Sequence, residues 1–282
     1  MASHRFRIVN VFTRGRTALS GNPLCVFENA SGFDDATMQA LARQLNLSET
    51  TFILPSARAD ARIRIFTPSY EMPFAGHPTL GTAHVCRSLG LGGDSLRLDL
   101  RAGLIPVTAV GDRWTLTAPT PTWREFDVPR SILAHALALE KRDIGERPLW
   151  VKAGKEQLIV PVASEDAVRR AAPQSAQFGQ IRSEDGMGMA YVFAHSGLGR
   201  VLARFFFPQG SAMLEDPATG SATANLGGWC LAMQKPLPVR LEIAQGEMVD
   251  RGSTLFLDVD GVRDIRVGGE VVEIASGALN LS

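Results

Sequence analysis

The chain has 282 residues, of which 45% are hydrophobic and 21% charged, and its 29 basic and 29 acidic residues leave no formal net charge. These values are typical of a globular protein and exclude disordered, collagen-like and coiled-coil classes. Nucleic acids and acidic membranes attract basic proteins, so neither is expected as a partner. Three cysteines are too few for a disulfide framework. Because no signal peptide or long apolar run is visible either, we expect a cytoplasmic protein.

The length suggests two domains, and an internal duplication indicates how they are related. Short motifs recur in the same order about half a chain apart. They are Arg64-Ile-Phe-Thr-Pro68 with Arg204-Phe-Phe-Phe-Pro208, Glu71-Met-Pro-Phe-Ala-Gly76 with Glu215-Asp-Pro-Ala-Thr-Gly220, and residues 98–103 with 241–246. We predict two copies of one domain, residues 1–119 and 120–282, in which the last strands can pack across the boundary. A cleft between such copies is a natural ligand site.

In chain order, the first copy has patterns typical of a helix over residues 34–45, a strand over 62–66, a helix over 78–89 and strands over 96–100, 105–110 and 114–118. A proline-rich linker over 118–122 follows. The second copy has helices over 130–139 and 165–171, a strand over 203–207, a helix over 221–233 and strands over 239–244, 255–259, 265–267 and 271–274.

The helices over 78–89 and 221–233 are small and apolar nearly all round, which is typical of a buried helix. The fold class predicted is therefore α+β, with a curved, mostly antiparallel sheet wrapped around one central helix in each copy.

Both central helices begin at a glycine, in Gly76-His77-Pro-Thr79 and Gly220-Ser221-Ala-Thr223. The first turn of a helix carries free N–H groups and a partial positive charge, so it attracts anions. Two such starts facing one cleft would bind a carboxylate or phosphate. The alternative is that Gly and Ser only permit the turn and cap the helix.

Polar residues that break the repeat are the better functional candidates. Asp216 and His77 have Met72 and Ser221 at the equivalent positions, whereas Glu71 and Glu215 are repeated and are expected to serve the fold, for instance by accepting backbone N–H bonds. Glu49, where the first helix gives way to a strand, is a third candidate acid. The sequence has no P-loop, dinucleotide, zinc-protease or CxxC motif, so no metal or nucleotide is indicated.

Four segments are distinctive: Gly21-Asn-Pro-Leu-Cys-Val-Phe27, Leu47-Ser-Glu-Thr-Thr-Phe52, residues 66–81 and residues 215–222. In these motifs the whole chain resembles the phenazine-biosynthesis PhzF-like isomerases, which have the diaminopimelate-epimerase-like fold. The resemblance implies an active site between two domains, a homodimer and no cofactor. The chain differs from the family pattern at Asn10, where Asp is common, and in a longer basic segment over 14–20.

Carried over residue by residue, the resemblance implies that Glu49 is the catalytic acid/base and that His77, Asp216 and Ser221 are the other polar residues of the site. It implies that the amides at Gly76 and Gly220 hold a substrate carboxylate. In the family's best-understood member, trans-2,3-dihydro-3-hydroxyanthranilate is isomerised when a proton leaves one ring carbon and returns to another. A carboxylic acid in a closed apolar cleft has a raised pKa and can return the proton that it took.

Thiol epimerases of this superfamily carry a cysteine just before each loop glycine, where this sequence has Ala75 and Thr219. We therefore expect a cofactor-independent isomerase acting on a small cyclic or amino carboxylic acid, and we read Cys25, Cys86 and Cys230 as small buried hydrophobic residues. Two alternatives remain. One is an epimerase or racemase that uses carboxylates in place of thiols, and the other is a non-catalytic carboxylate-binding protein on the same scaffold.

Overall fold

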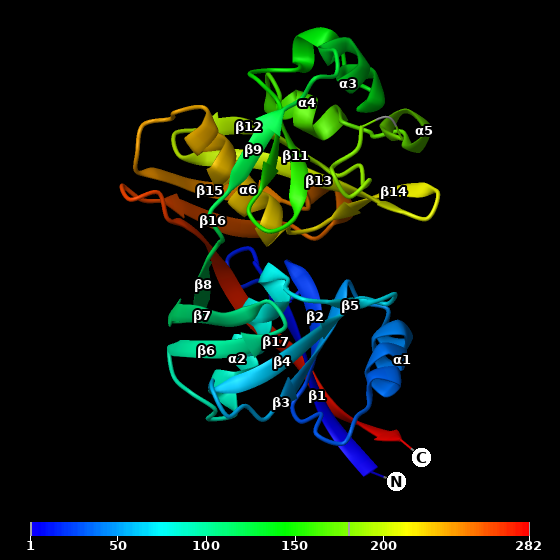
Figure 1. Cartoon of the computed structure of the whole chain (residues 1–282), viewed down its shortest axis with the longest axis vertical. Coiled ribbons are helices and arrows are strands. Elements are labelled where there is room, and N and C mark those ends of the chain that lie inside the picture. The colour runs from blue at the N-terminus through cyan, green and yellow to red at the C-terminus, as the bar shows by residue number, and fades with distance from the viewer. Residues whose placement is uncertain (1, 180, 282) are drawn as a thin grey trace. The chain divides into compact units, whose positions relative to one another are not determined.

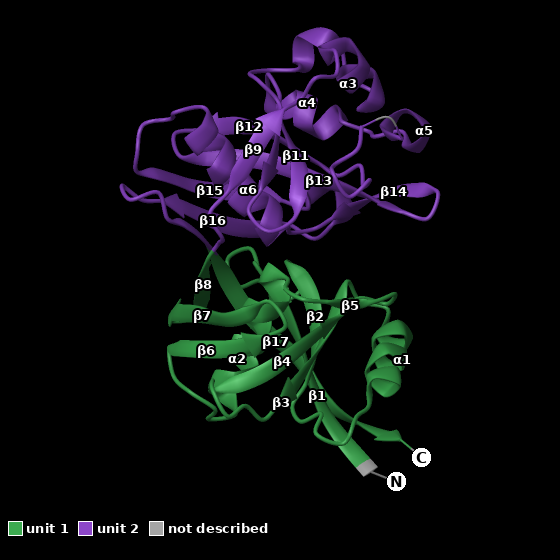
Figure 2. Cartoon of the chain, in the orientation of Figure 1, with its two compact units in different colours: residues 1–117, 268–282 green, residues 118–267 purple. Residues whose placement is uncertain are grey.

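A computed structural model describes residues 2–179 and 181–281 of the chain (Figure 1). The chain divides into two compact units, residues 1–117 with 268–282 and residues 118–267 (Figure 2). The observed division lies at the start of the proline-rich stretch, two residues before the predicted one. The predicted second domain also ran to the C-terminus, whereas the residues from Gly268 onward belong to the first unit.

In its described residues, the first unit is built from nine strands and two helices. They are β1 (Ala2–Val11), β2 (Asn22–Phe27), α1 (Asp35–Leu45), β3 (Glu49–Leu54), β4 (Ala61–Phe66), β5 (Glu71–Met72), α2 (Gly76–Ser88), β6 (Ser95–Leu100), β7 (Gly103–Val110), β8 (Arg113–Thr117) and most of β17 (Ile265–Leu281).

The sheet of the first unit closes on itself. Strand pairing runs from β1 to β2, β3, β4, β6, β7 and β8, and β17 then pairs with both β8 and β1. The pairs β2–β3 and β4–β6 are parallel and the other registered pairs are antiparallel. The C-terminal strand joins this unit because its hydrogen bonds complete the barrel.

Helix α2 occupies the inside of this barrel and contacts β1, β2, β3, β4, β6 and β8. Its residues are small because the surrounding strands leave little room. A Cβ on Gly81 would lie 2.6 Å from Cδ2 of Leu24 and 2.8 Å from Cγ2 of Val11. Outside the barrel, Met38 and Leu41 of α1 pack in a cluster with Phe27 and Phe52. That packing fixes β3, the strand that begins at Glu49.

The part of the second unit that the structure describes contains eight strands, four helices and two 3₁₀ helices. They are β9 (Thr122–Glu125), α3 (Arg130–Ala136), η1 (Lys141–Asp143), β10 (Leu149–Lys152), β11 (Glu156–Pro161), α4 (Glu165–Arg170), α5 (Ser175–Phe178), β12 (Ala190–Gly197), β13 (Arg200–Gln209), β14 (Ala212–Asp216), α6 (Gly220–Ala232), β15 (Val239–Gln245), η2 (Glu247–Val249) and β16 (Ser253–Val259).

Strand pairing in the second unit runs from β9 through β10, β11, β12 and β13 to β15 and β16. Helix α6 contacts β9, β10, β11 and β16, as the central helix of the unit should. Residues of α3, α4 and α5, including Leu133, Val168 and Phe178, form a second core cluster with β11 and β12. The α+β class, with one helix wrapped by a curved sheet in each copy, is confirmed.

One predicted break in the sheet is wrong. The patterns over 265–267 and 271–274 indicated two strands, but β17 is continuous from Ile265 to Leu281. Gly268, which lies between those two patterns, allows close strand contact, since a Cβ there would lie 2.5 Å from Oγ1 of Thr115. Among the described residues, no helix has the length and apolarity required to cross a lipid bilayer.

Candidate active site

The repeated motifs form equivalent hairpins in the two units. Phe66 pairs with Glu71 across β4 and β5, and Phe206 pairs with Glu215 across β13 and β14. Glu71 accepts two hydrogen bonds from Arg64, at 2.7 and 2.8 Å, and Glu215 accepts two from Arg204, at 3.1 and 2.6 Å. The repeated acids therefore hold the hairpins through arginine and not, as expected, through backbone N–H groups.

Each hairpin leads into the start of a central helix. The residues before the two helices are Ala75 and Thr219, and neither side chain accepts a bond from the first turn. The cap positions are thus Ala75 and Thr219, whereas Gly76, Gly220 and Ser221, the residues of the capping alternative, lie in the first helical turns. Gly76 and Gly220 are both partly exposed. Because the first turn of a helix has no intrahelical partner for its N–H groups, these starts can donate to an anion.

In the first unit, the structure brings Glu49 and His77 together. Glu49 begins β3, where it lies opposite Leu24 of β2 in the parallel register. His77 is the second residue of α2 and its Nε2 lies 3.3 Å from Oε2 of Glu49. The side chain of His77 is 8% exposed and that of Glu49 is 15% exposed. The start of a strand and the start of a buried helix thus place a carboxyl group against an imidazole.

The imidazole of His77 is neutral. Burial lowers its pKa to about 3, and a hydrogen bond with the backbone of Pro23 opposes this only in part. Proline has no N–H, so the ring N–H must be donated to its carbonyl oxygen. A neutral imidazole carries a single N–H, which leaves its other nitrogen as an acceptor. The contact with Glu49 is consequently not an ion pair.

In the second unit, Asp216 ends β14 and is bonded to the turn that follows it. The Thr219 hydroxyl donates to Oδ2 of Asp216. Gln245 is fully buried, and its Oε1 accepts the backbone N–H of Thr219 at 3.2 Å. Its Nε2 donates to the Thr219 hydroxyl at 3.0 Å and to the backbone oxygen of Asp216 at 2.8 Å. The Thr219 hydroxyl thus accepts from Gln245 and donates its one hydrogen to Asp216.

Ser221 is the second residue of α6, at the position that His77 has in α2. Its Oγ lies 3.0 Å from Nε2 of the buried Gln157 on β11. The structure thus groups the predicted residues within their units, Glu49 with His77 and Asp216 with the α6 start. Gln157 and Gln245 were not predicted as part of this environment.

The cysteines have the properties expected of core residues. Cys25, Cys86 and Cys230 are buried, and burial raises the pKa of each thiol to about 12. A thiol with that pKa is protonated near neutral pH and is a poor base. The described residues contain no group of three or more His, Cys, Asp and Glu side chains placed to hold a metal ion.

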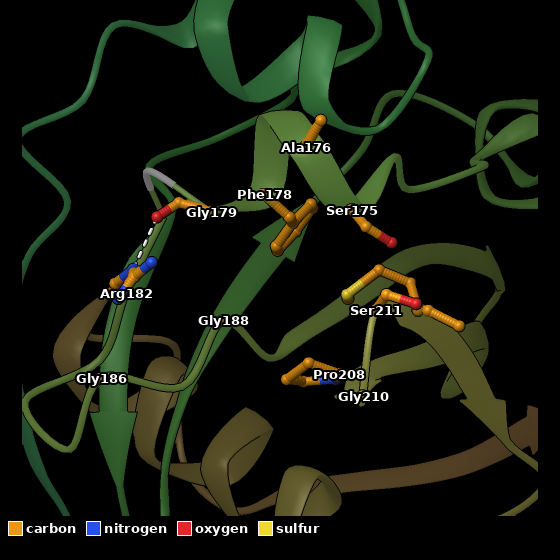
Figure 3. A pocket seen from close by; sticks show the side chains of 12 residues that line it. Ser175, Ala176, Phe178, Gly179, Arg182, Gly186, Gly188, Pro208, Gly210 and Ser211 are labelled. Carbon is orange, nitrogen blue, oxygen red and sulfur yellow. Dashed lines mark hydrogen bonds between the residues drawn. The ribbon is translucent and has the colours of Figure 1, made fainter.

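A depression of about 540 Å³ in the second unit is lined by α5 and the tip of the β13–β14 hairpin. Figure 3 shows Phe178 and Pro208 at this depression, with Arg182 donating to the Gly179 carbonyl at 2.6 Å. None of the predicted site residues lines it. We therefore do not assign the predicted chemistry to this depression.

Comparisons with known proteins agree with this architecture. A family model described as PhzC-PhzF, phenazine biosynthesis-like protein, matches residues 9–277. The chain belongs to the PhzC-PhzF family. An uncharacterized isomerase of Pasteurella multocida is 35% identical, with 99% of this chain and 95% of that protein covered. The trans-2,3-dihydro-3-hydroxyanthranilate isomerase of Pseudomonas aeruginosa is 33% identical, with 97% and 98% covered.

Solved structures show the same fold. A PhzF-family phenazine biosynthesis protein of Bacillus anthracis has a TM-score of 0.88 at 25% identity, with both chains fully covered. A hydroxyproline epimerase of Agrobacterium vitis has a TM-score of 0.66 at 13% identity, with 98% of this chain and 92% of that chain covered, and shows a likeness of fold alone. With relatives named as isomerases along the whole chain, this member of the PhzC-PhzF family is an enzyme of the isomerase class.

Proposed function

We propose that this protein is a cofactor-independent isomerase that moves a proton between carbon atoms of a small cyclic or amino carboxylic acid. The substrate class is similar to trans-2,3-dihydro-3-hydroxyanthranilate, the compound named for its relatives in Pseudomonas. The observation that carries the proposal is the contact of Glu49 with a neutral His77, 3.3 Å away.

Glu49 is the acid/base in this proposal. Carbon acids are weak, so the base must be positioned against the C–H bond and must be able to give the proton back. A cationic neighbour would favour the carboxylate and hinder the return of the proton. The neutral imidazole of His77 avoids this and offers one nitrogen that can accept a hydrogen bond from the protonated Glu49 or from a substrate amine or hydroxyl.

The substrate carboxylate is bound by helix-start amides in this proposal. The N–H groups at Gly76 and Gly220 are not used by a side-chain cap, which supports this role. Donors fixed by a helix need no reorganisation as negative charge develops during proton abstraction. Asp216, which accepts from Thr219, is assigned to a substrate amine or hydroxyl, and Ser221 to the carboxylate.

The test does not require the substrate to be identified first. Cyclic and amino carboxylic acids are incubated with the enzyme in deuterated water, and incorporation of deuterium at carbon is followed by NMR. Glu49→Gln should abolish incorporation while the same ligand still binds. Glu242→Gln is the matched control, because Glu242 is an exposed acid on β15.

The outcomes separate the alternatives. A shift of unsaturation with deuterium incorporation supports the isomerase, whereas inversion of one stereocentre without such a shift would point to an epimerase. Full exchange activity in Glu49→Gln would rule out the acid/base assignment. The resemblance also supports a homodimer, so we propose a second copy of the chain as partner, and light scattering in solution tests this separately.

A further inference from the structure

A chain of buried amide side chains lies behind Ser221 in the second unit. Asn225 is one helical turn beyond Ser221 on α6 and is fully buried, and Gln157 on β11 is 2% exposed. Asn225 Nδ2 lies 2.7 Å from Gln157 Oε1, and Gln157 Nε2 lies 3.0 Å from Ser221 Oγ. Polar groups this deeply buried cost free energy unless each is hydrogen-bonded.

Two backbone groups determine the direction of every bond in this chain. The backbone N–H of Ala153, which can only donate, lies 2.7 Å from Asn225 Oδ1. The carbonyl of Lys155, which can only accept, lies 2.9 Å from Asn225 Nδ2. The amide of Asn225 therefore has a single orientation, and its NH₂ group must donate to Gln157 Oε1. The NH₂ group of Gln157 must in turn donate to Ser221.

The Ser221 oxygen consequently accepts, and its own hydrogen is left for another acceptor. Ser221 is partly exposed at the helix start, where a ligand can supply that acceptor. We propose that Gln157 and Asn225 are positioning residues that orient the Ser221 hydroxyl so that it donates its hydrogen to the ligand. A carboxylate, which offers only acceptors, is then preferred to a carboxamide, which also presents N–H groups.

The duplication offers an internal comparison. With Gly76 and Gly220 aligned, Gly81 of α2 stands where α6 has Asn225, and His77 stands where α6 has Ser221. A Cβ on Gly81 would lie 2.6 Å from Leu24, so the first unit has no room for an amide at that position. The chain of amides is thus particular to the second unit. A structural role shared by both domain copies would have placed such amides in both, so it does not explain the amides of the second unit.

The inference rests on the proposed function, because it takes Ser221 to contact the substrate. The probes are 2-amino-3-hydroxybenzoate, an aromatic analogue of the compound named for the relatives, and its carboxamide, titrated into the full-length protein. Gln157→Glu presents an acceptor to Ser221, so the hydroxyl turns inward and its lone pairs face the ligand. The affinity for 2-amino-3-hydroxybenzoate (the benzoate) should fall roughly tenfold to hundredfold. The affinity for its carboxamide should change much less.

A double-mutant cycle separates reorientation of Ser221 from simple charge repulsion. Ser221→Ala should lose similar affinity, and Gln157→Glu should cost almost nothing more in the Ser221→Ala background. Gln157→Met is a second test that adds no charge, for use if the Glu variant folds poorly. It removes the donor to Ser221, so the hydroxyl is free to rotate and the preference for the benzoate over the carboxamide should decrease. Gln209→Glu, at an exposed position of β13, is the matched control and should change neither affinity.

Two results would overturn the inference. One is wild-type protein that shows no preference for benzoate over the carboxamide. The other is a loss in Gln157→Glu that persists in full when Ser221 is already Ala, since repulsion alone would then explain it. Both results concern ligand binding and say nothing about whether Glu49 catalyses deuterium exchange. A wrong acid/base assignment appears only as exchange that survives in Glu49→Gln, so the two failures are distinguishable.

Discussion

His77 and Glu49 lie 3.3 Å apart, and burial rather than charge decides how they interact. An exposed histidine beside a carboxylate would be protonated more readily, because the opposite charge favours the cation. Here the cost of removing a cation from water is larger, and the pKa of His77 falls to about 3. His77 therefore remains neutral near neutral pH, as the proposed role of Glu49 as acid/base requires.

This pKa predicts how stability depends on pH. The unfolded chain binds a proton on His77 below about pH 6.5, and the folded protein does so only near pH 3. Acidification through this window therefore favours unfolding, by up to about 1.4 kcal/mol per pH unit. Urea unfolding of wild type and His77→Gln should give free energies whose difference is constant above about pH 7 and moves against the wild type from about pH 6 to about pH 4.5.

A parallel pH dependence of the two proteins would contradict a buried neutral His77. Nitrogen-15 NMR of the imidazole gives an independent check, since His77 should have the chemical shifts of a neutral ring at about pH 5. His4, which is partly exposed on the N-terminal strand, is the natural internal comparison.

The buried thiols predict resistance to thiol reagents. With pKa values of about 12, each of Cys25, Cys86 and Cys230 should be almost entirely protonated at about pH 8. An aromatic disulfide reagent should react slowly with the native enzyme and rapidly with all three thiols after denaturation. Fast labelling of the native enzyme with matching loss of activity would favour thiol chemistry over the Glu49 mechanism.

The buried arginine of the second hairpin should cost more stability when it is replaced than an exposed arginine does. Arg204 is bonded to Glu215 and also donates to the Arg169 carbonyl at 3.0 Å at the end of α4. Its side chain is 13% exposed and that of Glu215 is 7% exposed. Arg204→Met leaves a buried carboxylate without its cation and should destabilise the protein by about 3–5 kcal/mol.

Chemical denaturation measures this cost. Arg240→Met is the control, because Arg240 is 76% exposed in its pair with Asp258 and should change stability by less than about 1 kcal/mol. Adding Glu215→Gln to Arg204→Met should recover part of the loss. Equal effects at Arg204 and Arg240 would show that the repeated pair does not hold the hairpin.

Much of the duplicated fold could be predicted from the sequence, because single helices and strands depend on the pattern of neighbouring residues. The glycines at the two helix starts, the apolar helices and the alternating strands indicated the duplicated fold. The partners of buried polar groups could not be predicted, because Gln157 and Asn225 meet only when β11 packs on α6. One signal was present, since an Asn within an otherwise apolar buried helix must find partners. The repetition of Arg64 and Arg204 was a further signal, but from the sequence we expected Glu71 and Glu215 to accept backbone N–H bonds instead.

Asn10, which stands where the resemblance led us to expect Asp, supports a last prediction. The residue is fully buried, and its Nδ2 donates to the Ala18 carbonyl at 2.5 Å, so it fastens the basic segment over 14–20 to β1. In Asn10→Asp, a carboxylate oxygen would face that carbonyl and no hydrogen would lie between them. Stability should fall by about 1–3 kcal/mol near neutral pH. The deficit should shrink at low pH, where a protonated Asp can donate again.

Urea unfolding of Asn10→Asp and Asn29→Asp tests this directly. Asn29 is exposed, and its Oδ1 accepts from the Ser31 N–H and hydroxyl. Aspartate preserves that role, so Asn29→Asp should leave stability nearly unchanged. Unchanged stability in Asn10→Asp would show that the bond to Ala18 does not hold the segment over 14–20 to β1.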